Sequence, residues 1–214
     1  MIQSPQPRTP ATLADDLVAL IEQTPRDHPV RVAVDGPPWS GIDVAALVMV
    51  ALRASGGAGY VVDARDFLRP ASVRLERGRD DPDGFYEDWV DLAALRREVL
   101  EPLGPGGSGR FLPSLWDSDS DRATRADYVD APAGAVVLVR GWFLLGAGLP
   151  FDRTVHLALS SPARQRRVPA DAAARELPAW DRYDDEVGPS ELADVVVRCD
   201  DPRRPAVLVR AERR

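Results

Sequence analysis

A chain of 214 residues, 44% of them hydrophobic, is long enough to bury one sizeable core and lies near the upper size of a single domain. The net charge of −7 argues against general attraction to nucleic-acid phosphates, and no apolar run approaches the roughly 18 residues of a membrane span. Cys199 is the only cysteine, which excludes cysteine-cluster metal sites, and all 27 basic residues are arginine. We therefore expect a cytoplasmic protein with a small-molecule ligand, no nucleic-acid or membrane partner and no protein-bound metal site.

The first predicted elements are a disordered arm and an amphipathic helix. Residues 1–10 carry three prolines and few apolar side chains, which predicts a disordered arm. Residues 12–24 have the apolar spacing of a helix and begin with a threonine suited to capping it. We expect residues 11–214 to form one domain.

A strand, a loop and a helix are predicted next. Residues 31–36 are a β-branched run that ends in glycine, and residues 44–54 have a helical composition. We expect the strand to lie inside a sheet and the helix to start near Ile42.

The rest of the chain alternates further strands with polar and helical segments. Residues 70–86 read as a polar connection with a turn at DDPDG, and residues 87–103 repeat apolar side chains at helical spacing. Unalternated apolar runs are typical of parallel strands buried on both faces. The predicted further strands are residues 60–62, 135–139, 154–159 and 193–197. The pattern predicts an α/β fold with a parallel sheet of about five strands flanked by helices.

The loop after the first strand has the length and glycine positions of the phosphate-binding pattern GxxxxGK[ST]. It reads GPPWSGID over residues 36–43, so the lysine and hydroxyl positions hold Ile42 and Asp43. An aliphatic side chain does not neutralise phosphate, and a carboxylate in the first helical turn already satisfies the positive end of the helix dipole. Either the loop is a tight turn with Asp43 stabilising the helix, or it retains some anion binding.

The order and spacing of segments resemble the uridine kinase family over most of residues 31–205. Residues 63–70 (DARDFLRP) resemble the family segment that carries the catalytic aspartate. Residues 80–85 (DDPDGF) resemble the stretch whose first aspartate binds ribose hydroxyls. Residues 113–117 (PSLWD), followed by Asp121 and Arg122, are similar to the segment that faces the base.

Two later segments also resemble the family. Residues 136–141 (VVLVRG) are similar to the strand that ends in an acidic residue and glycine, and Arg164, Arg166 and Arg167 fall where the lid arginines lie. This implies a P-loop fold of the nucleoside kinase type, with ATP and magnesium as cofactors if the chain is active.

The candidate site residues follow from that resemblance. The candidate catalytic carboxylates are Asp63 and Asp66. The candidate cofactor-binding residues are Gly36, Ser40, Gly41, Asp43, Arg140, Arg164, Arg166 and Arg167. The candidate substrate-binding residues are Phe67, Arg69, Asp80, Trp116 and Arg122.

The departures from the family fall at catalytic positions. Arg65 occupies the place of the catalytic aspartate, and Arg140 replaces the acidic residue near the metal. Arg140 either faces the cleft as a substitute cation or pairs with Asp43 or Asp63 and closes the site. Trp39 is a candidate to fill the vacated pocket.

Simpler structural interpretations stand beside these assignments. Asp63 and Asp66 are either a general base or loop aspartates paired with arginine. The arginines at 164–167 are more often a solvated helix face than a lid, and His156 reads as a satisfied core residue.

Three functions remain open. The first is a uridine kinase-like protein that binds a nucleoside or nucleotide with little or no phosphotransfer. The second is an active ATP-dependent kinase of a nucleoside or other small hydroxyl compound, in which arginines replace the lysine. The third is a non-catalytic interaction protein, so whether the chain is an enzyme stays open.

Overall fold

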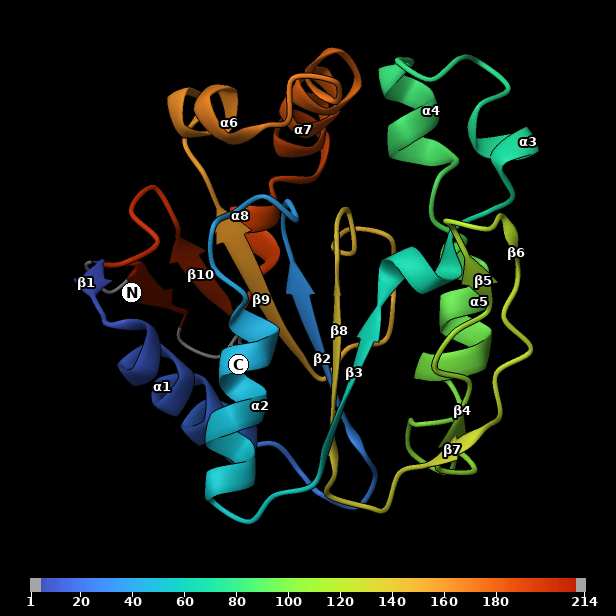
Figure 1. Cartoon of the computed structure of the whole chain (residues 1–214). Coiled ribbons are helices and arrows are strands. Elements are labelled where there is room, and N and C mark those ends of the chain that lie inside the picture. Colours follow the sequence, from blue (N-terminus) through green and yellow to red (C-terminus); the bar gives the residue numbers. More distant parts are fainter. Residues whose placement is uncertain (1–4, 211–214) are drawn as a thin grey trace.

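The computed structural model describes residues 5–210 as a mixed α/β fold around a mostly parallel sheet (Figure 1). In order across the sheet, its strands are β1 (Gln6–Pro7), β11 (Ala206–Val209), β10 (Val195–Arg198), β9 (Arg153–Ala158), β2 (Val30–Asp35), β8 (Val136–Gly141) and β3 (Gly59–Asp63). The five strands from β10 to β3 run parallel to one another. At the edge of the sheet, β11 pairs antiparallel with β10, and β1 pairs antiparallel with β11.

The predicted parallel sheet of about five strands is confirmed, and β2 lies inside it between β9 and β8. The β1–β11 extension was not predicted, because strands of two and four residues are too short to show a period. Residues 6–7 were assigned to a disordered arm, yet they pair with β11, and the Arg8 amide donates to the Pro205 carbonyl at 2.8 Å. Residues 1–4 of that arm lie outside the described residues.

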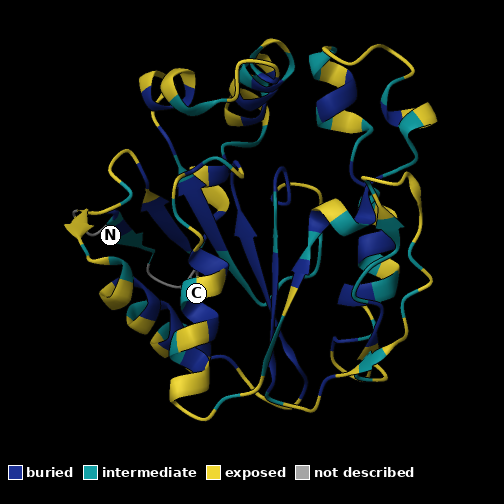
Figure 2. Ribbon diagram, viewed as in Figure 1, coloured by how far each residue is buried: buried dark blue, intermediate teal, exposed yellow. Residues whose placement is uncertain are grey.

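Apolar side chains alternate between the two faces of the sheet. Val32 and Leu138 pack on one face against α1 (Pro10–Glu22) and α2 (Val44–Ala54). Val137 and Val139 point to the other face, towards α5 (Leu92–Leu95) and its continuation η2 (Arg96–Leu100), the latter a π-helical turn. Figure 2 shows the resulting layers, with buried strands and outer helix faces exposed to solvent.

The carboxyl end of the sheet is covered by short helices. In Figure 1, α4, α6 and α7 lie above the arrowheads of the central strands. The helical elements in this part of the molecule are η1 (Ala64–Phe67), α3 (Ala71–Arg74), α4 (Pro82–Glu87), α6 (Ser161–Arg167), α7 (Ala173–Val187) and α8 (Pro189–Leu192). Two small two-stranded sheets lie beside the main sheet. One is the hairpin of β5 (Trp116–Asp117) and β6 (Arg122–Ala123), and the other pairs β4 (Arg110–Phe111) with β7 (Val129–Asp130) near the start of β3, where the Tyr60 hydroxyl donates to the Asp130 carbonyl at 2.9 Å.

Two helix predictions need correction. The segment 70–86, expected to be a polar connection, contains α3 and α4, and α4 is capped by the Asp81 carboxylate. The helix expected over residues 87–103 begins only at Leu92, because Val90 forms a bridge to Leu68 and the Asp91 side chain caps the new helix through the Ala94 amide.

Among residues 5–210, no helix combines the length and the apolar character that crossing a membrane requires.

Candidate functional site

The loop Gly36–Asp43 joins β2 to α2 in a conformation that depends on its two glycines. A Cβ atom at Gly36 would lie 2.6 Å from the Leu157 Cβ atom on β9, and Gly41 has a φ of 87°, in the left-handed region. The Asp43 carboxylate caps α2 by accepting from the Ala46 amide at 2.9 Å. The helix therefore starts at Val44, within two residues of the predicted position.

Arg140 lies at the carboxyl end of β8, and its guanidinium joins two aspartates across the loop. Its Nη1 atom lies 2.9 Å from the Asp43 Oδ2 atom, and its Nε atom lies 2.8 Å from the Asp63 Oδ2 atom. Arg140 is paired in register with Val34 of β2 and with Asp63 of β3, so the sheet itself holds these groups together. The sequence left open whether Arg140 is a free cation in the cleft or pairs with Asp43 or Asp63. In the structure it pairs with both aspartates.

A second arginine completes this cluster. The Arg65 Nη2 atom lies 2.9 Å from the Asp63 Oδ2 atom, and 56% of the Arg65 side chain is exposed. Burial alone would raise the pKa of Asp63, but hydrogen bonds and charge from Arg65 and the charge of Arg140 outweigh it and hold that pKa below its ordinary value. Asp63 is thus an ion-paired carboxylate, which is a poor proton acceptor.

The loop and the ion pairs line a pocket of about 330 Å³. Its charged lining consists of two carboxylates, Asp43 and Asp63, and two guanidiniums, Arg65 and Arg140. Its apolar walls include Pro37 and Ile42. Of the predicted cofactor-binding residues, the pocket brings together Gly36, Ser40, Gly41, Asp43 and Arg140.

Asp66, the other candidate catalytic residue, lies beside this pocket. Its backbone carbonyl accepts from the Leu115 amide at 2.9 Å, so the segment is tied to the β5–β6 hairpin. Burial, and then the charge of Asp63, raise the pKa of Asp66. Asp66 therefore holds its proton to a higher pH than an ordinary aspartate does, and a catalytic role for it stays a prediction.

Trp39 does not fill the vacated pocket, in contrast to the prediction. Its indole Nε1 donates to the Glu176 Oε2 atom at 2.6 Å, and its ring packs edge-on against Trp180 of α7 at 6.5 Å. Burial raises the pKa of Glu176, and the hydrogen bond from Trp39 partly offsets that rise. The loop is thereby fastened to α7.

This contact gives a stability prediction. We expect Trp39→Phe to lower the free energy of unfolding by about 1–2 kcal/mol more than Trp116→Phe, since Glu176 is buried and hydrogen bonds to buried carboxylates are strong. Trp116 is the matched control because its indole donates to the exposed Asp121 at 3.1 Å. Urea unfolding at neutral pH measures both, and equal losses would contradict the assignment.

Two of the three arginines that the resemblance placed in a lid are engaged by other groups of the protein. Arg164 is buried and pairs with Asp181 and Asp184 of α7 at 3.1 and 2.7 Å. Arg167 donates to the backbone carbonyls of Ser40 and Cys199 at 2.6 and 2.7 Å, and so ties the loop to the end of β10. Neither lines a solvated helix face, whereas Arg166 is exposed.

The predicted substrate-binding residues are not gathered at the pocket. Phe67 is fully buried in the core and is out of reach of a ligand, which corrects its assignment. Within residues 5–210, none of the five lines the loop pocket. Arg69 pairs with Asp88, and Trp116 hydrogen-bonds Asp121. Asp80 lies exposed on a turn, and Arg122 lies exposed on β6.

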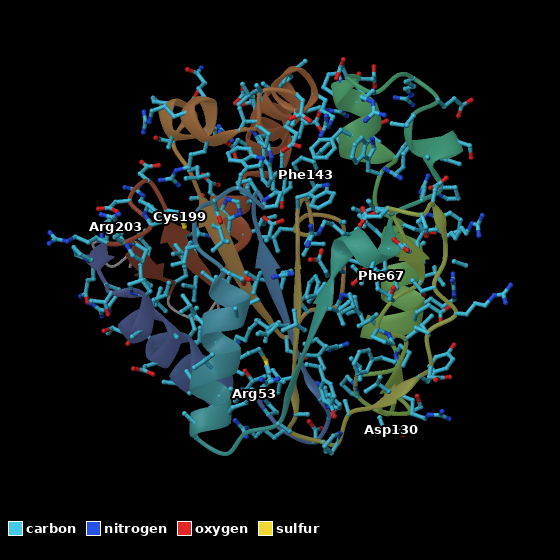
Figure 3. All side chains as sticks on the ribbon, in the orientation of Figure 1. Arg53, Phe67, Asp130, Phe143, Cys199 and Arg203 are labelled. Carbon is cyan, nitrogen blue, oxygen red and sulfur yellow. The ribbon has the colours of Figure 1, made fainter. Side chains whose placement is uncertain are left out.

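An aromatic cluster that the sequence did not suggest joins α4 to α7 over the sheet. At its centre is Phe143, with ring centroids 4.6 Å from Trp180, 4.9 Å from Tyr86, 5.0 Å from Tyr183 and 5.4 Å from Phe85. Figure 3 shows Phe143 beyond the end of β8 and below α7. Its φ of 57° is unusual for a residue other than glycine. Packing of these rings holds the two helices together at this end of the molecule.

A buried polar network lies directly behind the loop, and it confirms the prediction that His156 is a satisfied core residue, although the sequence did not identify its partners. Asp35 is completely buried and accepts from His156 Nδ1 at 2.7 Å, from the Leu144 amide at 2.9 Å and from the Tyr183 hydroxyl at 3.1 Å. Burial raises the pKa of Tyr183, so its hydroxyl stays protonated and donates. The apolar residues around His156 gave no sign of its hydrogen-bond partners. An aspartate at position 35, in a strand predicted to be buried, was the one signal in the sequence that a buried partner was needed.

No family profile matches this chain, and no curated protein matches its sequence. Solved structures do resemble its fold, and two of them superpose as follows. A possible uridine kinase from Bacillus stearothermophilus superposes with a TM-score of 0.70 and 21% identity, over 86% of this chain and 97% of that one. A protein described as a fructose transport system kinase from Silicibacter sp. gives a TM-score of 0.54 and 23% identity, over 87% and 90%. The chain therefore has the mixed α/β fold of P-loop kinase structures.

Proposed function

We propose that this chain is a small-molecule-binding protein on a kinase-like P-loop fold, that it binds a nucleoside or nucleotide in the loop pocket, and that it has little or no phosphotransfer activity. The observation that carries the proposal is the Arg140 guanidinium, which bridges Asp43 and Asp63 inside the pocket at 2.9 and 2.8 Å. A kinase needs a cation that is available to a phosphate, but the Arg140 guanidinium is already engaged by two carboxylates.

The residues around the loop do not fit ATP with magnesium. Position 42 supplies an aliphatic side chain instead of an ammonium, and the Asp43 carboxylate is already engaged by the Ala46 amide and by Arg140. A triphosphate would also approach two carboxylates, and removing either from Arg140 leaves a partly buried charge unpaired.

The charge of the pocket favours an uncharged nucleoside over a charged nucleotide as the ligand. Two aspartates and two arginines line it, so their formal charges cancel, and each arginine is paired with a carboxylate. Apolar walls together with a few polar groups suit a compact ring system bearing hydroxyls. An uncharged nucleoside therefore fits better than a polyphosphate.

One observation favours an active kinase as a second candidate. Arg65 is more than half exposed at the edge of the pocket, so its guanidinium can reach a phosphate if it leaves its ion pair with Asp63. In that case Asp66 would be the remaining carboxylate near the reacting group. A non-catalytic interaction protein is the third candidate.

Calorimetry with uridine and with ATP–magnesium distinguishes these functions, together with an assay for ATP-dependent phosphorylation of uridine and cytidine. We expect uridine to bind, ATP–magnesium not to bind, and no turnover to be measured. Binding of both ligands with turnover above about 1 per second would establish an active kinase. Binding of neither would favour the interaction protein.

A variant pair locates the ligand. Arg140→Ala should change the affinity for uridine because it opens the ion pair inside the pocket. Arg166→Ala is the matched control, an exposed arginine outside the pocket, and should leave the affinity unchanged. Equal effects of the two changes would place the ligand elsewhere.

A further inference from the structure

Helix α2 carries apolar side chains on every side. Of its 11 residues, VAALVMVALRA, only Arg53 is charged. One side packs on the sheet and α1, whereas the outer face, formed by Ala46, Val50, Arg53 and Ala54, is exposed. Figure 2 shows this mixture of buried and exposed residues along the helix. At 69%, Val50 is the most exposed large apolar side chain among residues 5–210. A helix that is apolar all round is normally buried all round, so this face suits a partner.

The neighbouring strand β3 adds to the apolar surface. It is the last strand in the order of the sheet, so within residues 5–210 its outer edge is unpaired. A Cβ atom at Gly59 would lie 2.7 Å from the Leu52 Cδ2 atom of α2, which shows that this side of β3 adjoins the helix. Val61, two residues further on, points to the same side and is 41% exposed. Native proteins usually charge or cover such an edge, but residues 59–62 carry no charge.

Opposite charges stand at the two ends of the outer face. Asp43, Ala46, Val50 and Arg53 follow one another at spacings of three, four and three residues, which places them along one line of the helix surface. The Asp43 side chain is 51% exposed although it pairs with Arg140. Arg53 is exposed, and its side chain has no hydrogen-bond or ion-pair partner within residues 5–210. The line is therefore negative at its start, apolar in the middle and positive at its end.

This order of charges is complementary to itself. In an antiparallel pair of α2 helices with a two-fold axis at the level of Val48, Ala46 of each copy faces Val50 of the other. The same axis places Arg53 of each copy opposite Asp43 of the other, because both pairs of positions are centred on residue 48. Alanine opposite valine lets two helices approach closely. We propose that the outer face of α2 binds a second copy of this chain in this antiparallel arrangement.

The pairing brings a residue of one copy to the ligand pocket of the other. Asp43 lines the loop pocket, so the Arg53 guanidinium of the second copy adds a positive charge at the edge of that pocket. The dimer does not depend on which ligand the loop pocket binds. A single short helix and a strand edge make a small interface, and we expect a weak dimer that dissociates on dilution.

Sedimentation velocity of the full-length protein from about 1 µM to about 1 mM tests the dimer, since weak protein complexes have dissociation constants in this range. We expect the parent to pass from monomer to dimer. Val50→Glu should weaken the dimer by about tenfold or more, because it buries a charge without a partner. Val73→Glu is the matched control, since Val73 is an exposed valine of α3, and it should leave the dimer unchanged. Circular dichroism checks that both variants keep the fold. A parent that stays monomeric throughout, or equal effects of the two variants, would overturn the proposal.

A charge reversal tests the end pairs. Arg53→Glu should weaken the dimer by about fivefold or more, because two symmetry-related ion pairs become repulsive. Arg79→Glu makes the same change on an exposed turn and should have no such effect.

Cysteine cross-linking tests the register. The native Cys199 is buried, so single variants Ala46→Cys and Val50→Cys each add one accessible thiol. Under mild oxidation, a mixture of the two variants should form the mixed disulfide faster than either variant forms its own, because position 46 faces position 50. Faster cross-linking within either single variant would contradict the antiparallel arrangement, as would equal weakening by Arg53→Glu and Arg79→Glu.

Discussion

Replacing Asp35 with alanine is expected to lower the free energy of unfolding by about 3–5 kcal/mol, the usual result of removing one partner from a buried ionic network. The change leaves three buried hydrogen-bond donors without their acceptor: His156 Nδ1, the Leu144 amide and the Tyr183 hydroxyl. Asp35 and His156 are held in register across β2 and β9, so neither can move far to find a new partner. Asp35 is completely buried, so its lost hydrogen bonds are not replaced by contact with bulk solvent.

Urea unfolding followed by circular dichroism measures this loss. Asp35→Asn keeps an acceptor oxygen and should lose less than Asp35→Ala. Asp185→Ala makes the same chemical change on the exposed side of α7 and should stay within about 0.5 kcal/mol of the parent. A loss below about 1 kcal/mol for Asp35→Ala would mean that the three donors are readily satisfied otherwise.

The Tyr183→Phe change shows how far the network acts as a unit. In a double-mutant cycle with Asp35→Ala, we expect the two losses to be less than additive, because both changes remove the hydrogen bond between Tyr183 and Asp35. Strict additivity would show that the hydrogen bond from Tyr183 to Asp35 contributes nothing to stability, and that the aromatic cluster and the Leu145 backbone hold Tyr183.

The parallel sheet was predictable because its strands are unalternated apolar runs, which arise when both faces are buried. Residues 31–36 and 135–139 each read as such a run, and β2 and β8 lie side by side in the centre of the sheet. The loop between β2 and α2 was predictable from two glycines at fixed spacing, because one permits a close approach to β9 and the other a left-handed φ.

The covering helices and the contacts at the carboxyl end were not predictable in the same way. Helices of four to six residues, such as α3 and α4, are too short to show a helical period. The Arg140 bridge joins residues 97 and 77 positions apart, and only the register of three strands brings them together. Phe143 reads as part of an apolar run, and nothing local indicates that its ring lies between α4 and α7.

The loop itself can be tested by returning the missing phosphate-binding groups to it. We expect the double change Ile42→Lys with Asp43→Thr to raise the affinity for ATP–magnesium by about tenfold or more, equivalent to 1.4 kcal/mol. Lysine supplies the missing ammonium at a position that lines the pocket, and threonine removes one carboxylate from the pocket. The amides at the start of α2 are then open to an anion.

The fold should tolerate this double change. Threonine is itself a good helix cap, so it can replace the Asp43 carboxylate in accepting from the Ala46 amide. Arg140 keeps its ion pair with Asp63 at 2.8 Å. Trp39 presents no obstacle, because its ring packs on Trp180 and lies outside the pocket lining.

Calorimetry with ATP–magnesium should be run on the double variant, on the parent and on Ile42→Ala with Asp43→Thr. The last of these is the matched control, since it opens the same space and removes the same carboxylate but supplies no ammonium. If affinity rises only with lysine, the backbone of the loop still forms a phosphate cradle, and charge alone keeps phosphate out of the parent. If both double variants bind as poorly as the parent, the tie from Arg167 to the Ser40 carbonyl at 2.6 Å holds the loop in a shape that does not accept phosphate. That outcome would shift the balance towards the non-catalytic interaction protein.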